Sequence, residues 1–226
     1  MSVAENLHII QEKINASCLK AGRKASEVEV IAVTKYVNSQ RAKEAVSAGI
    51  RHIGENRPEG LIEKYEALKE DGVSFHFIGT LQSRKVKMVL PYADYIHSLD
   101  RLSLAKEIEK RAEQSVKCFV QVNVSGEATK HGLSMAETVP FIESLQTFSK
   151  IQVVGLMTMA PQTDDESLLR SVFRKLKELQ CDVEAKGWAH APCHELSMGM
   201  SGDYTIAVEE GATFVRIGTA LVGKEG

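Results

Sequence analysis

The 226-residue chain has few cysteines, few aromatic residues and no excess of either charge. Its four cysteines, at positions 18, 118, 181 and 193, form no closely spaced framework, so we expect free thiols in a reducing compartment rather than a disulfide-stapled fold. Twenty-eight basic residues against thirty acidic ones give a net charge of −2. This balance leaves no basic footprint for nucleic acid or for an anionic membrane.

Long apolar runs are also missing. No run approaches the roughly 18 residues that a membrane span requires. The first ten residues, MSVAENLHII, lack the basic region that precedes the apolar core of a signal peptide. We therefore expect a cytoplasmic protein that binds neither membranes nor nucleic acid.

What the chain does have is a regular alternation of strand and helix patterns. With 43% apolar and 26% charged residues it can bury a sizeable core, and its length favours one domain over residues 1–226. Short β-branched apolar runs alternate with amphipathic stretches. We count eight such runs, at residues 28–37, 50–56, 74–80, 94–100, 117–124, 151–159, 193–199 and 213–223.

Helix start and stop signals lie before and between these runs. Apolar residues at helical spacing predict a first helix that ends near residues 21–22, and further helices over 39–49, 58–70 and the region after residue 166. Ser134 with Glu137, and Thr163 with Glu166, have the spacing of capping boxes. Strict alternation of apolar strands with helices predicts a parallel sheet covered by helices. Eight units favour a closed (β/α)8 TIM barrel with an extra N-terminal helix, and an open doubly wound sheet is the alternative.

In such a barrel, functional side chains lie at the carboxyl ends of the strands. Lys35 follows the first apolar run directly, and partial desolvation at the barrel mouth would favour its neutral amine, a candidate Schiff-base nucleophile. The alternative is an ordinary surface lysine at a strand end.

Two turns near the C-terminus have the character of a phosphate site. Small residues around Ser201 precede a short helix predicted over 203–210, and Gly218 with Thr219 follows the last apolar run. Amides at such turns converge on anions, and barrel phosphate sites often follow strands seven and eight. A lysine at one strand end and a phosphate cradle at the opposite rim suit a ligand with an aldehyde and a phosphate, such as pyridoxal 5′-phosphate (PLP).

Two other features allow different interpretations. His190, Cys193 and His194 lie close together, but the chain lacks a second spaced ligand pair, so we expect no metal site. Arg84, Lys85 and Lys87 form a basic stretch that fits a solvated helix face, with an interaction surface as the alternative.

Seven ordered blocks resemble the pyridoxal phosphate homeostasis proteins, also called YggS-like or proline-synthetase-co-transcribed proteins. More distantly, they resemble the barrel domain of alanine racemase. The blocks are IAVTKYV at 31–37, HIGENRPEG at 52–60, FHFIGTLQSRKVK at 75–87, VNVSGEATKHGL at 122–133, GLMTMAP at 155–161, LSMGMSGDY at 196–204 and VRIGTALVG at 215–223.

The resemblance implies a role for each of several residues. Lys35 would hold PLP as an internal aldimine, Asn56 would lie beside the ring, and Arg216 would approach the pyridine nitrogen. Ser201, Gly218 and Thr219 would bind the phosphate. Where many members have an aromatic residue after Gly-Glu-Asn, this chain has Arg57-Pro58, which changes the local contacts around the ring.

The resemblance also implies a function in intracellular PLP (vitamin B6) homeostasis, without efficient catalysis. The alternative is a PLP-dependent amino-acid racemase. Racemisation needs one base on each face of the substrate, and in alanine racemases the second base, a tyrosine, comes from an added domain of a partner subunit. This chain ends at Gly226, directly after the last strand, so we expect no efficient racemase. We also expect a monomer that passes PLP to PLP-dependent apo-enzymes.

Overall fold

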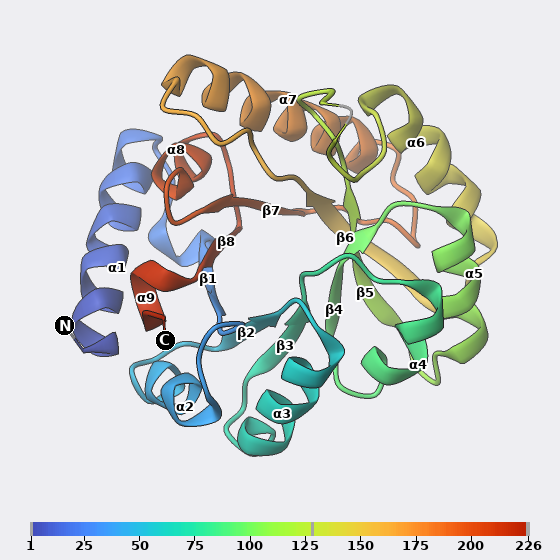
Figure 1. Cartoon of the computed structure of the whole chain (residues 1–226). Coiled ribbons are helices and arrows are strands. Elements are labelled where there is room, and N and C mark those ends of the chain that lie inside the picture. Colours follow the sequence, from blue (N-terminus) through green and yellow to red (C-terminus); the bar gives the residue numbers. More distant parts are fainter. Residues whose placement is uncertain (1, 128, 225–226) are drawn as a thin grey trace.

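The computed structural model describes residues 2–127 and 129–224, and its centre is a closed barrel of eight parallel strands (Figure 1). Each strand pairs with its neighbours in sequence, and β8 closes the barrel on β1. The predicted TIM barrel is confirmed, and the doubly wound alternative is wrong. The strands are β1 (Glu29–Val33), β2 (His52–Glu55), β3 (Ser74–Phe77), β4 (Tyr95–Leu99), β5 (Val116–Gln121), β6 (Ile151–Met157), β7 (Glu195–Met200) and β8 (Phe214–Ile217).

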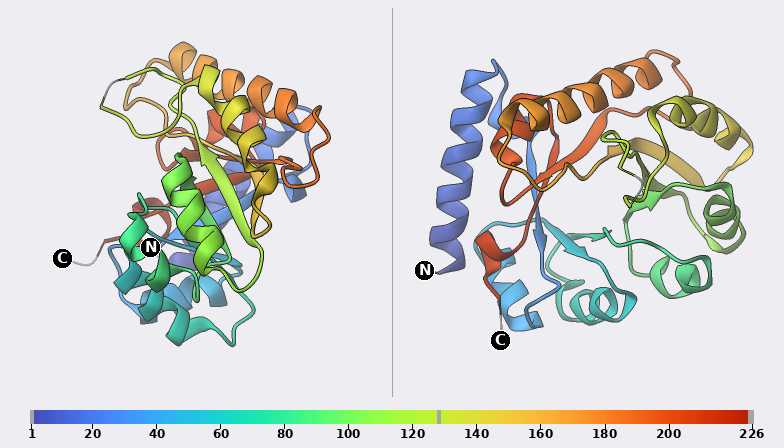
Figure 2. Two further views of the ribbon diagram at one scale, coloured as in Figure 1. Left: turned by 90° about the vertical axis from the view of Figure 1, so that its right-hand side faces the viewer. Right: turned by 45° about the horizontal axis from the view of Figure 1, so that its top comes forward.

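Helices surround the barrel, and the predicted extra N-terminal helix packs on α8 and α9 on its outside (Figure 2). The α-helices are α1 (Val3–Lys20), α2 (Ser39–Ser47), α3 (Pro58–Leu68), α4 (Val86–Val89), α5 (Leu102–Arg111), α6 (Met135–Ser144), α7 (Glu166–Glu184), α8 (Tyr204–Glu209) and α9 (Thr219–Val222). Short 3-10 turns lie at Ala25–Glu27, Ser83–Lys85 and Leu145–Thr147. Among residues 2–127 and 129–224, no helix combines the length and apolar character that crossing a bilayer would need.

The caps show where local sequence decides a helix boundary. Ser134 and Glu137 form the predicted capping box at the start of α6. The second predicted box is wrong: the side chain of Asp165 caps α7 by accepting from the Leu168 amide at 3.1 Å. Thr163 lies two residues before this cap, and its hydroxyl accepts from the Asp165 amide instead. A carboxylate one residue before the helix therefore takes the place of the hydroxyl.

Two hydrophobic regions stabilise the fold. The larger one fills the space between the outer face of the barrel and the helices, where the apolar face of α7 packs. The smaller one lies inside the barrel and consists of Ile31, Phe119, Met157 and Phe214. The rest of the interior includes buried polar side chains, among them His76, His97 and Arg216. Burying polar groups is costly unless they are hydrogen-bonded, so these residues need partners inside the barrel.

Candidate functional site at the barrel mouth

The six predicted site residues all lie at or directly after the carboxyl ends of β1, β2, β7 and β8. Side chains alternate along a strand, and Ile31 faces the interior, so Val33 follows on the same side, and Lys35 lies in the turn directly after β1. Ile31 pairs with Arg216, which puts Gly218 beside Val33, and a Cβ added at Gly218 would lie 3.6 Å from the Val33 Cβ. Asn56 follows β2 directly, in a turn.

The Lys35 side chain is exposed, so the partial desolvation expected from the sequence is wrong for this structure. Its amine lies 4.8 Å from the centroid of the Tyr36 ring. Tyr36 is itself 53% exposed, so the pair stands in solvent at the mouth. The amine is therefore open to attack an incoming carbonyl group.

A buried carboxylate lies next to Lys35. Glu55, at the end of β2, accepts a hydrogen bond from the Thr34 hydroxyl at 2.6 Å, and the buried Lys64 amine lies 4.0 Å from the same oxygen. Gly60 leaves room for this carboxylate, because a Cβ there would lie 2.7 Å from Glu55 Oε2. Burial raises the pKa of Glu55, and the Thr34 hydrogen bond and the Lys64 charge oppose that shift. The network ties Thr34, the residue directly before Lys35, to the end of β2.

Arg216 forms the floor of the mouth and is 5% exposed. Its guanidinium donates to the Ser197 hydroxyl oxygen at 2.5 Å and to the Thr158 carbonyl at 2.9 Å. Burial lowers the pKa of Arg216 to about 10, and the charge of Asp203 partly compensates. Because a guanidinium has five N–H donors and these are its two hydrogen bonds within the described residues, donors remain for a ligand.

The two candidate phosphate turns are adjacent. Ser201 and Thr219 are exposed, and the first turn of each following helix leaves amides without intrahelical partners. Gly199 has a φ of +91°, and a Cβ there would lie 2.6 Å from the Ala207 Cβ, so only glycine allows α8 to pack this closely on β7. The expected position of the cradle at the rim opposite Lys35 is wrong, because β8 pairs with β1.

The alternative metal cluster is not supported. Within the described part of the chain, no group of three histidine, cysteine or acidic side chains could hold a metal ion. His190 bonds to the Ile142 carbonyl, and His194 bonds to Glu184 at 2.8 Å. Cys193 is buried, and all four cysteines are free thiols.

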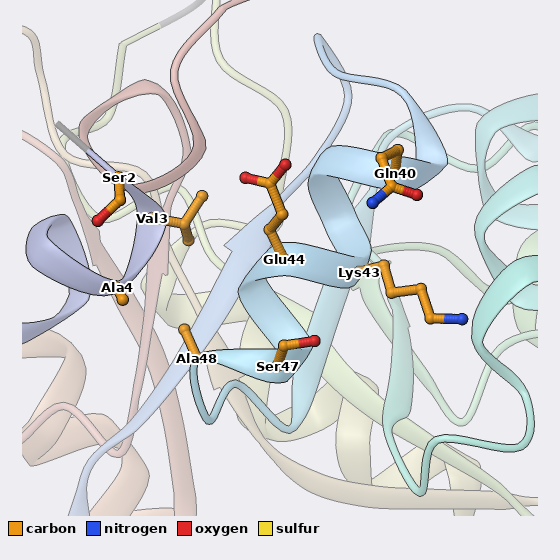
Figure 3. Close-up of a pocket in the computed structure, with 8 residues that line it drawn as sticks. All are labelled: Ser2, Val3, Ala4, Gln40, Lys43, Glu44, Ser47 and Ala48. Atoms are coloured by element: carbon orange, nitrogen blue, oxygen red, sulfur yellow. The ribbon is translucent and has the colours of Figure 1, made fainter.

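Two further features lie on the surface. A hollow of about 450 Å³ lies between the start of α1 and α2 (Figure 3). In it the Ser2 hydroxyl already caps α1, Glu44 bonds to Arg41, and the Lys43 amine points away from both. In the basic stretch, Arg84 bonds to Gln82 on the 3-10 turn before α4.

Sequence reasoning missed the residues that support the floor. One of them is Ser197. The others are three histidines that form a hydrogen-bonded chain below it: His52, His76 and His97. Each of these histidines lies in one of three successive strands, β2, β3 and β4. The sequence signal for this chain was a histidine in each of three consecutive apolar runs.

The fold and the mouth define a (β/α)8 barrel of the alanine racemase type. The family model for the N-terminal domain of alanine racemase matches residues 6–226. The chain is 39% identical to a pyridoxal phosphate homeostasis protein of Aquifex aeolicus, with 99% of each chain covered. It belongs to the family of pyridoxal phosphate homeostasis proteins.

Solved structures agree with this assignment. An unknown protein from Bifidobacterium adolescentis superimposes with a TM-score of 0.93 at 36% identity, with 97% of this chain and 94% of that chain covered. PipY of Synechococcus elongatus, solved with PLP bound, superimposes with a TM-score of 0.82 at 30% identity, with 98% of this chain and 100% of that chain covered. The similarity thus extends over nearly the whole barrel.

Proposed function

We propose that this protein binds PLP at the barrel mouth and serves intracellular PLP homeostasis. The observation that carries the proposal is that the pairing of β1 with β8 brings the turn holding the exposed Lys35 to the same end of the barrel as Arg216 and Gly218. The name of the Aquifex relative and the PLP-bound state of PipY support it.

The residues of the mouth suit the shape of PLP. The aldehyde and the phosphate-bearing arm of PLP are on neighbouring ring carbons, which suits a lysine and a phosphate turn on the adjacent strands β1 and β8. When bound, PLP supplies an aldehyde carbon that condenses with the Lys35 amine and releases water. Ser201, Gly218 and Thr219 would bind the phosphate, and Asn56 would lie beside the ring.

Arg216 would face the ring nitrogen with its remaining donors. A permanent cation there disfavours protonation of the pyridine and so weakens the ring as an electron sink. We therefore propose a carrier without efficient catalysis, monomeric, that passes PLP to apo-enzymes. Incubation of the PLP-loaded protein with L- and D-amino acids in deuterated solvent should give negligible α-hydrogen exchange. Rapid exchange with inversion that depends on Lys35 would favour a racemase instead.

Spectroscopic titration with PLP tests the binding proposal. The unmodified protein should develop an absorption band distinct from that of free PLP, and Lys35→Ala should abolish it. Lys43→Ala, which changes an exposed lysine of α2, is the matched control and should keep the band. If Lys35→Ala keeps the band, the Lys35 assignment is wrong.

Transfer is tested separately. The loaded protein is mixed with an apo-enzyme whose activity requires PLP, with an equal concentration of free PLP as the reference. Recovery of activity with a stoichiometric loss of the protein's band supports delivery, and retention of the band with an inactive apo-enzyme contradicts it.

A further inference from the structure

Three histidines connect the floor of the mouth to the opposite end of the barrel. We call His52, His76 and His97 the imidazole chain. His52 Nδ1 lies 2.9 Å from His76 Nε2, and His76 Nδ1 lies 2.9 Å from His97 Nε2. His97 Nδ1 lies 2.9 Å from the Ser197 hydroxyl oxygen, and this oxygen accepts a hydrogen bond from Arg216. The chain therefore runs through the interior and ends at the guanidinium.

Packing holds each ring of the chain in place. His76 and His97 are fully buried, whereas His52 is half-buried at the lower end. His76 stacks on Tyr95 and His97 on Phe119, each with 4.3 Å between ring centroids. The rings thus have little freedom to turn away from their hydrogen bonds.

The hydrogens of the chain have one consistent direction. A guanidinium only donates, so the Ser197 oxygen accepts from Arg216 and its own hydrogen is free to donate to His97 Nδ1. His97 then donates from Nε2 to His76, and His76 donates from Nε2 to His52. The remaining His52 hydrogen, on Nε2, faces the Glu29 carboxylate at 3.8 Å.

The opposite direction leaves a group unsatisfied. If His97 donated from Nδ1 to Ser197, the serine hydrogen would have no acceptor within the described residues, since its other neighbour there is the Arg216 donor. His52 would then present a lone pair to Glu29. Leaving a buried donor without an acceptor costs free energy, so the first direction is favoured.

The surroundings keep the imidazole chain neutral. Burial and neighbouring positive groups hold the pKa of both His76 and His97 well below its usual value. The positive charge of Arg216 lowers the pKa of His97, and that of Lys117 on β5 lowers the pKa of both His76 and His52. The carboxylate of Asp94 opposes the shift at His52. At the lower end, Glu29 lies near Glu195. A proton on His97 would place a second cation beside Arg216 in a dry interior.

We propose that the imidazole chain is a positioning device for Arg216 and acts through the hydroxyl of Ser197. With the Ser197 hydrogen held by His97, its oxygen faces Arg216 permanently, and the Thr158 carbonyl fixes the second nitrogen. The unused guanidinium donors are then aimed at the mouth. This inference rests on the proposed function, since it assigns those donors to the PLP ring nitrogen.

The test uses the protein without cofactor. Nitrogen-15 NMR of the imidazoles should show all three rings as neutral Nε2–H tautomers at pH 7.5. In His52→Leu, the last acceptor is gone, so His97, two rings away, should shift to a mixture of tautomers. His52→Gln offers an oxygen as acceptor and should restore the original pattern. A purely structural role for His52 would leave the His97 tautomer unchanged, and that result would overturn the proposal.

A second readout follows Arg216 itself. In His97→Phe, which keeps an aromatic ring against Phe119, the Arg216 guanidinium hydrogens should exchange with solvent at least tenfold faster. Ser197→Ala should act in the same way and changes the volume less, while His8→Gln on the surface should have no effect. Unchanged exchange in both interior variants would contradict the proposal.

The outcomes also separate this inference from the proposed function. If the tautomers and the exchange behave as expected but PLP does not bond to Lys35, the proposed function fails while the positioning of Arg216 stands. If PLP bonds to Lys35 but the tautomer of His97 does not change in His52→Leu, only the proposed positioning role of the imidazole chain is refuted.

Discussion

Arg216 and Lys35 lie at the same end of the barrel, but they differ in burial and in bonding. Arg216 is 5% exposed and is anchored by Ser197 and Thr158, whereas the Lys35 amine is exposed beside the Tyr36 ring. The floor of the candidate site is therefore built before any ligand arrives, and the rim is open. We expect substitutions below the rim to reduce stability and substitutions on the rim to reduce binding.

This division concerns the side chains of the rim and not its backbone, which is tightly packed in one turn and open in another. A Cβ at Gly79 would lie 2.2 Å from the Asn56 carbonyl oxygen, whereas a Cβ at Gly202 would meet nothing within 4 Å. Gly79→Ala should lower the free energy of unfolding by about 3 kcal/mol through overpacking. Gly202→Ala should change it by less than about 0.5 kcal/mol. Urea unfolding measures both, and equal effects would remove the distinction between the two turns.

The floor should make stability depend on pH. His76 and His97 have pKa values well below 6.5 in the folded protein because they are buried, whereas the unfolded chain binds a proton at each near 6.5. Stability is thus fully present above that pH and is lost as the pH falls below it. The loss rises toward a limit of about 1.4 kcal/mol per histidine and pH unit, which is approached only well below pH 6.5.

Urea unfolding at several pH values measures this slope. His97→Phe should halve the contribution of the two histidines, and His8→Gln, an exposed control, should leave the slope unchanged. If the slope were the same in His97→Phe and in the unmodified protein, His97 would be protonated to the same extent in the folded and the unfolded state.

On the rim, Ser201→Ala should weaken PLP binding without loss of stability. A hydrogen bond to a charged group contributes on the order of 1.5 to 3 kcal/mol, so the dissociation constant should rise at least about tenfold. Pyridoxal, which lacks the phosphate, should bind the unmodified protein and Ser201→Ala with similar affinity. Titrations followed by absorbance give the constants, and an equal loss of affinity for pyridoxal would place Ser201 away from the phosphate.

The smallest expected effect lies at the cap of α7. Asp165→Ala should cost about 1 kcal/mol because it removes the acceptor for the Leu168 amide, and Thr163→Ala should cost less. Thermal unfolding distinguishes the two variants. A larger cost for Thr163→Ala would restore the capping box predicted from the sequence.

The sequence predicted the barrel because helix signals separate most of its eight apolar runs, and parallel strands leave few topologies. The sequence alone does not identify the cap of α7, because Thr163 and Asp165 are both residue types that cap helices well. The path of the chain after β6 determines which of the two caps the helix. It also placed the phosphate turns across from Lys35, because closure makes β8 a neighbour of β1 and linear order hides this.

The supporting residues of the floor were harder to predict. His52, His76 and His97 are each 21 or more residues apart in sequence, and their contacts depend on strand register. Ser197 lies in a recognised motif, yet only its position opposite Arg216 gives it a role. Residue type was enough to predict the candidate residues of the rim, whereas the contacts of the floor depend on how the strands are aligned.

Borohydride trapping followed by peptide mass analysis tests the central claim, that Lys35 at the open rim holds PLP, most directly. The protein is loaded with PLP, reduced and digested, and the modified lysine is identified. A single pyridoxyl adduct on Lys35 is the predicted result. An adduct on another lysine, with Lys35 unmodified, would contradict the account.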